Sequence, residues 1–123
     1  MLKLTAILLT ALAALAPASI IHAEGPVSSV KALIDQESAR AGLNVACMER
    51  LNQRESGGDP YAVNPSSGAT GPFQFMRSNS VWFSSPQAAE GDDPSDPFAN
   101  VRAAVWLQAR GFGATGWGID CRF

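Results

Sequence analysis

The residues best suited to chemistry lie in residues 55–74, which read E-S-G-G-D-P-Y-A-V-N-P-S-S-G-A-T-G-P-F-Q. The carboxylate of Glu55 stands at the start of this run. The Gly, Pro, Asn and Ser that follow are dense enough to break any regular element, so they predict a shaped loop of the kind that carries binding residues. The run ends in an aromatic segment, F-Q-F-M, that holds the amide of Gln74. We therefore interpret Glu55 as the candidate acid/base of a loop-built cleft.

The rest of the composition excludes several other kinds of chemistry. The only histidine, His22, lies in a predicted leader segment, and if it is removed with that segment no Ser-His-Asp or Cys-His nucleophile can form. A formal net charge of −2 with no Lys/Arg cluster argues against a nucleic-acid or anionic-membrane partner. Asp92-Asp93 lacks the twelve-residue calcium pattern, so we interpret it as a solvated loop. Neither a metal nor a cofactor is expected.

Residues 1–23 are predicted to be a secretory signal peptide. Lys3 precedes a run that is apolar over residues 4–16, and Pro17 and small residues follow. This run is too short for a membrane span, although an uncleaved anchor is the alternative. Cleavage is expected after Ala18 or after Ala23, and we favour Ala23 because polar sequence begins at Glu24. Residues 24–123 would then form one periplasmic or secreted domain with a modest core.

Three helices are expected to position the candidate site. Apolar stripes between an N-cap residue and a glycine predict them over residues 28–41, 44–56 and 96–110. The second helix leaves Glu55 and Ser56 in its last turn. Residues 73–83 suggest a further short helix and residues 88–95 an exposed acidic loop. No alternating strand pattern appears, so the domain should be mainly α with at most a small hairpin.

The two cysteines, Cys47 and Cys121, are most simply a disulfide in an exported chain of this size. The bond would close a loop of roughly 75 residues, and such closure typically contributes about 4 kcal/mol. Two free thiols or a redox pair are the alternative.

Several of these segments together resemble one known family. Q-R-E-S-G-G-D-P-Y-A-V-N resembles the catalytic signature of the lysozyme-like soluble lytic transglycosylases, with Glu55 at the catalytic glutamate and Ser56 beside it. S-G-A-T-G-P-F-Q-F-M resembles the signature that lines their glycan cleft, with Gly71 and Gln74 in place. The C-terminal W-G-I-D-C, paired with Cys47, is similar to small secreted members with one disulfide.

The resemblance implies a fold and an activity. The fold would be lysozyme-like (the α+β lysozyme superfamily), here a small, mainly α domain with little or no sheet. The activity would be cleavage of the β-1,4 bond between N-acetylmuramic acid and N-acetylglucosamine in peptidoglycan, with Glu55 as the single acid/base and a 1,6-anhydro sugar as product. The glycan strand would be the partner of a monomeric enzyme. The residues expected to contact it are Ser56, Gly71, Phe73, Gln74 and, by stacking on a sugar ring, Trp117.

The chain also departs from the family pattern. Pro72 and Phe73 replace its Leu-Met, Arg77 stands where proline is common, and the later Ala-Tyr-Asn motif has no match, with Tyr61 in the wrong place to replace it. Three alternatives therefore stay open. They are a hydrolytic muramidase using Asp59 or Asp96 as a base, a non-catalytic peptidoglycan-binding module, and an exported assembly protein of an envelope-spanning machine.

Overall fold

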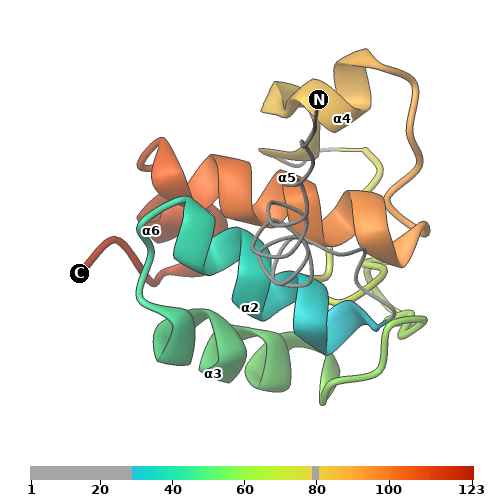
Figure 1. Cartoon of the computed structure of the whole chain (residues 1–123). Coiled ribbons are helices and arrows are strands. Elements are labelled where there is room, and N and C mark those ends of the chain that lie inside the picture. Colours follow the sequence, from blue (N-terminus) through green and yellow to red (C-terminus); the bar gives the residue numbers. More distant parts are fainter. Residues whose placement is uncertain (1–28, 79–80) are drawn as a thin grey trace, which may run out of the picture.

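The computed structural model describes residues 29–78 and 81–123. The elements in order are α2 (Val30–Arg40), α3 (Val45–Ser56), the 3-10 helix η2 (Val81–Ser84), α4 (Pro86–Ala89), α5 (Pro97–Ala109) and α6 (Gly113–Trp117) (Figure 1). These residues contain no strand, only isolated antiparallel bridges of Thr70 with Val63 and with Phe75. The expectation of a mainly α domain with little or no sheet is confirmed.

The predicted signal peptide and His22 lie outside the described residues. Within the described part of the chain, no helix is both long enough and apolar enough to cross a bilayer.

The three helices predicted from capping patterns are present. Side chains of Ser29, Asn44 and Asp96 accept hydrogen bonds from backbone N–H groups of the first turns of α2, α3 and α5. These bonds satisfy donors that a helix N-terminus otherwise leaves unpaired. Gly57 ends α3 in the left-handed region, with φ 64°, a conformation that glycine adopts at little cost. The end of α3, and with it Glu55, is thus set by local sequence.

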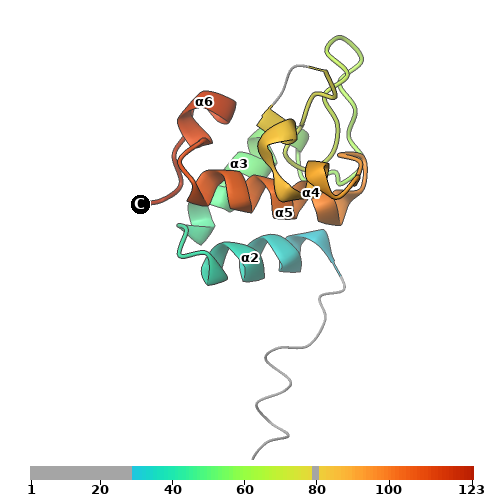
Figure 2. The same cartoon turned by 90° about the horizontal axis from the view of Figure 1, so that it is seen from above.

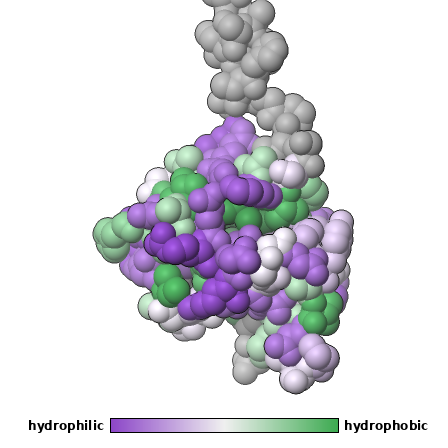
Figure 3. Space-filling view, turned by 90° about the horizontal axis from the view of Figure 1, so that it is seen from below, coloured by the Kyte–Doolittle hydropathy of each residue, from purple (hydrophilic) through white to green (hydrophobic). Residues whose placement is uncertain are grey.

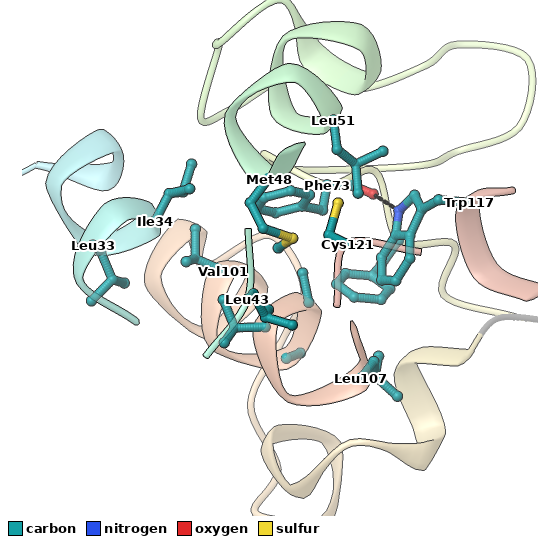
Figure 4. Close-up of a cluster of buried hydrophobic side chains, with 14 of the residues drawn as sticks. Leu33, Ile34, Leu43, Met48, Leu51, Phe73, Val101, Leu107, Trp117 and Cys121 are labelled. Atoms are coloured by element: carbon teal, nitrogen blue, oxygen red, sulfur yellow. Dashed lines mark hydrogen bonds between the residues drawn. The ribbon is translucent and has the colours of Figure 1, made fainter. Parts of the chain in front are cut away.

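Helix α2 packs against both α3 and α5, and α6 packs against α5. Helix α2 lies between α5 and α3 in Figure 1, and Figure 2 shows α6 on the side of α5 away from α2. Helix α5 is the most buried element, and Val101, Ala104 and Leu107 are fully enclosed. Met48 and Leu51 of α3 meet these residues in the core (Figure 4).

The expectation of a helix over residues 73–83 is wrong. Residues 71–75 form a tight turn instead, in which Gly71 has φ 81° and Gln74 φ 54°, and helical structure begins only at η2. Two positive φ angles around Pro72 cannot belong to a right-handed helix.

Two short helices were not predicted from the sequence. α4 begins at Pro86 behind the cap Ser85, and its end overlaps the start of the stretch 88–95, where a loop was expected. α6 contains two glycines, a composition with poor helix propensity. The burial of Trp117 in the core favours α6 all the same, because tertiary packing overrides weak propensity.

Cys47 and Cys121 form the predicted disulfide, with 5.5 Å between their Cα atoms. The tail is also held by Gln108, whose buried amide donates to Ile119 O at 3.0 Å and accepts from Cys121 N at 2.9 Å. In addition, Asn44 N donates to Cys121 O. The C-terminal segment is therefore fixed against the N-terminus of α3.

Candidate active site

Glu55 lies in the last turn of α3, at the border between the core and solvent. Its side chain is 22% exposed, so the carboxylate is sheltered yet reachable. Its Oε2 accepts hydrogen bonds from Arg54 Nε at 3.0 Å and pairs with Arg54 Nη2 at 2.9 Å. The carboxylate is therefore oriented by a guanidinium fork.

Arg54 also reaches a distant part of the chain. Its Nη2 donates to Trp117 O at 2.6 Å, a contact between residues at the end of α3 and the end of α6. Although its side chain is 46% exposed, Arg54 connects Glu55 to the C-terminal segment.

Asn52 joins α3 to the Gly-rich loop that follows the helix, residues 57–74. Its Nδ2 donates to Pro72 O at 3.0 Å and to Ser56 Oγ at 3.3 Å. Ser56 Oγ in turn donates to Asn52 O at 3.1 Å. Asn52 precedes Glu55 by three residues and Ser56 by four, a spacing that places all three on one side of the helix. That spacing is the sequence signal that could have identified Asn52.

A buried side chain of α5, Asn100, holds the Gly-rich loop in place. Its Nδ2 donates to Thr70 O at 3.0 Å and Pro94 O at 2.7 Å, and its Oδ1 accepts from Phe73 N at 2.9 Å. Gly71 lies directly against this amide, and a Cβ there would come within 2.8 Å of Asn100 Cγ. Gly71 therefore serves close packing of the loop on α5.

Replacing Asn100 by alanine is expected to destabilise the fold by about 2 to 3 kcal/mol, because three buried backbone groups lose their partner. Chemical denaturation would measure the loss. Asn64→Ala is a suitable control, since Asn64 is exposed and its side chain bonds only within its own turn. Equal stability of both variants would contradict the proposed role of Asn100.

The side chain of Gln74 is anchored to the loop backbone through its amide nitrogen. Its Nε2 donates to Ala62 O at 3.1 Å and Gly71 O at 3.0 Å, and two carbonyl acceptors require that the amide nitrogen, not the oxygen, faces them. Among the described residues no donor bonds to Oε1, which leaves it available as an acceptor. Gln74 also lines a pocket of about 150 Å³ together with Phe75, Met76, Val81, Thr115, Gly116 and Trp117.

The structure corrects the substrate-binding prediction for two aromatic residues. The side chain of Phe73 is fully buried, and Trp117 is only 9% exposed. The ring centroids of Trp117 and Phe75 are 5.5 Å apart, and Trp117 Nε1 donates to Phe73 O at 2.9 Å (Figure 4). Burial therefore leaves little of either ring for contact with a sugar, although Trp117 lines the Gln74 pocket. The burial of Trp117 reflects its packing in the aromatic cluster.

Three other carboxylates, those of Asp59, Asp93 and Asp96, have structural partners. Asp59 Oδ1 accepts from Tyr61 N at 2.9 Å, and Asp96 Oδ1 accepts from Phe98 N at 2.9 Å as the cap of α5. Hydrogen bonds from Ser95 and from Arg77 lower the pKa of Asp93 to about 2. In the described ranges, no three potential metal-ligating His, Cys, Asp or Glu side chains come together.

The tertiary structure links the end of α3 to the Gln74 pocket through Arg54 and Trp117. Glu55 and Ser56 end α3, Arg54 bonds to the carbonyl of Trp117, and Trp117 shares the pocket with Gln74. The surface seen from the side of α3 is largely hydrophilic, with smaller hydrophobic patches between polar side chains (Figure 3).

Comparison with known proteins is consistent with this arrangement. Residues 32–116 match the Transglycosylase SLT domain. A "Probable transglycosylase SceD" of Staphylococcus epidermidis is 45% identical over 67 residues, which are 52% of this chain and 30% of that protein. One from Staphylococcus aureus strain N315 is 36% identical over 93 residues, which are 72% of this chain and 39% of that protein.

The chain thus spans between 30% and 39% of the length of these relatives. No solved structure matches it. Because the matched region includes Glu55, the Gly-rich loop and α5, this chain belongs to the transglycosylase SLT domain family.

Proposed function

We propose that the chain is a lytic transglycosylase that cleaves the bond between N-acetylmuramic acid and N-acetylglucosamine in peptidoglycan, with Glu55 as its single acid/base. The observation that carries the proposal is the placement of Glu55, sheltered at the end of α3 and linked through Arg54 and Trp117 to the Gln74 pocket. The names of the relatives, probable transglycosylases, support the same reaction class. An exported enzyme, periplasmic or secreted, would meet this substrate and would keep the disulfide oxidised.

In the proposed reaction, Glu55 first protonates the oxygen of the leaving sugar. The acetamido oxygen of the substrate stabilises the positive charge that develops at the anomeric carbon. Glu55 then accepts the proton of the sugar's own 6-hydroxyl, which closes the 1,6-anhydro ring. The tethered hydroxyl has a high effective concentration and so outcompetes water, as long as the cleft holds water out.

Arg54 would assist the carboxylate that forms when Glu55 gives up its proton. A guanidinium at 2.9 Å stabilises that charge and holds the oxygen in the position from which it later acts as a base. Gln74 Oε1 would accept a hydrogen bond from a sugar amide or hydroxyl. Ser56, whose hydroxyl is bonded to Asn52, would act by fixing the end of α3.

Arg54→Gln is expected to lower kcat about tenfold with little change in KM, because a hydrogen bond to a charged group contributes roughly 1.5–3 kcal/mol and this one matters after proton transfer. Steady-state kinetics on soluble glycan strands would measure it. Arg50→Gln, an exposed change one turn earlier in α3, is the control. An unchanged kcat with a raised KM would instead assign Arg54 to substrate binding.

The proposed reaction is tested by mass spectrometry of the soluble products of peptidoglycan digestion. Products that end in 1,6-anhydro-N-acetylmuramic acid are expected. Free reducing ends would identify a hydrolytic muramidase, in which Asp59 or Asp96 would have to act as a base. Binding of glycan without any product would identify a non-catalytic module.

A further inference from the structure

A second and larger pocket lies on the side of α5 away from the Glu55 site. Its volume is about 400 Å³, within the range of ligand-binding clefts. It is formed by α2, α5 and Gln87 of α4, and it shares no residue with the Gln74 pocket. Figure 2 shows α2 and α6 on opposite sides of α5. The residues that give it chemical character are Glu37, Arg40, Gln87, Arg102, Trp106 and Arg110.

Positive charge is concentrated in this pocket, which has three guanidinium groups and one carboxylate among its lining residues, although the whole chain has a formal net charge of −2. Arg110 lies over the ring of Trp106, 4.4 Å from its centroid. Arg102 is 49% exposed and approaches Glu37 only to 4.0 Å. By contrast, Arg77 and Arg122 contact carboxylates at 2.6 Å. Arg102 and Arg110 therefore keep N–H groups available for an anion.

One acceptor in the lining of the pocket has no hydrogen-bond donor within the protein. Gln87 Oε1 is buried and, among the described residues, has no hydrogen-bond partner. A buried acceptor without a donor is costly, so a ligand that supplies an N–H is favoured. A phosphate polymer supplies negative charge without an N–H. A peptide with a free carboxylate supplies both groups, and its apolar atoms can pack on the half-buried Trp106.

We propose that this pocket binds the acidic stem peptides that peptidoglycan carries on its glycan strands. The carboxylate would lie between Arg102 and Arg110, and an amide N–H would donate to Gln87 Oε1. The identity of the ligand rests on the proposed peptidoglycan substrate, although the site is independent of catalysis by Glu55. Stem peptides and glycan belong to one polymer, so a second contact would raise the effective concentration of glycan at the cleft.

Indole N–H resonances in NMR spectra test binding, because Trp106 lines this pocket and Trp117 lines the Gln74 pocket. Soluble stem peptides with free carboxylates are expected to shift the Trp106 resonance saturably and leave that of Trp117 unchanged. Arg102→Ala and Arg110→Ala should each weaken binding roughly tenfold, the loss of one charge-assisted hydrogen bond. Arg50→Ala, which removes an equal charge from the exposed face of α3, should bind normally. The same peptides with amidated carboxylates should bind weakly.

Inorganic polyphosphate provides the contrasting probe. If it shifts Trp106 at concentrations as low as the peptide does, the site is one for phosphate polymers, and the peptide assignment is overturned. No shift of Trp106 with either probe would overturn the site itself. If Arg50→Ala weakened peptide binding as much as Arg102→Ala and Arg110→Ala do, the effect would come from overall charge, and the proposed site would also be overturned.

Kinetics separate this inference from the proposed function. Arg102→Ala/Arg110→Ala should raise KM for strands that carry stem peptides and leave KM unchanged for strands from which an amidase has removed them. A rise in KM on both substrates would contradict a peptide site. If the wild-type protein cleaves neither substrate, the proposed function fails, whereas the NMR titration still decides the pocket.

Discussion

Replacement of Glu55 by glutamine is expected to abolish formation of 1,6-anhydro products, with a loss in rate of about a thousandfold, within the range that a general acid/base contributes. Glutamine keeps the size of the side chain and its capacity to accept from Arg54, but it cannot give or take the proton. Because the proposal gives both proton transfers to the same carboxylate, no other group is expected to replace it. Product analysis by mass spectrometry and the initial rate on purified peptidoglycan measure the effect.

Glu49→Gln is the matched control for this experiment. Glu49 lies on the same helix and pairs with Lys31 at 2.6 Å, well before the turn that carries Glu55. Its replacement removes an equal charge and should leave the rate near that of the wild type. Both variants should have the near-ultraviolet circular dichroism of the wild type, since neither change reaches the core. If Glu55→Gln retained substantial activity, the single acid/base mechanism would be wrong and another carboxylate should be sought.

Removal of the disulfide should have the largest effect on stability. The Cys47→Ala/Cys121→Ala variant is expected to lose about 4 kcal/mol of unfolding free energy, because a bond between residues 74 apart in sequence restricts the unfolded chain strongly. That is a large part of the 5–15 kcal/mol typical of a small domain. Urea denaturation followed by tryptophan fluorescence would measure the loss.

Wild-type protein treated with a reductant provides the comparison for that variant. It should lose a similar amount of unfolding free energy. Because reduction breaks the cross-link but keeps the sulfur atoms, this result would assign the loss to the cross-link and not to a small cavity left by missing sulfur atoms. The Gln108 hydrogen bonds should keep the tail in place at low denaturant, so cleavage activity should persist there. An unchanged urea midpoint after complete reduction would contradict a stabilising role for the cross-link.

Much of the fold could be predicted from the sequence because it depends on neighbours in the chain. Ser29, Asn44 and Asp96 cap helices through contacts within three residues, and Gly57 ends α3 through its own backbone conformation. These local rules placed Glu55 at a helix terminus next to an irregular loop. The disulfide partner of Cys47 followed from the presence of only one other cysteine.

Only the tertiary structure decided what surrounds Glu55. Arg54 meets Trp117 across 63 positions of sequence and Asn100 meets Phe73 across 27, and no local pattern specifies such pairs. The tight turn at Gly71 depends on the side chain of Asn100 in α5, which is why residues 73–83 do not form the expected helix. Trp117 was expected at the surface of a Gly-rich tail, but it is buried because it packs on aromatic rings from a distant loop. The sequence by itself determined the helices, the position of Glu55 and the cross-link, whereas the contacts that orient Glu55 depend on long-range packing.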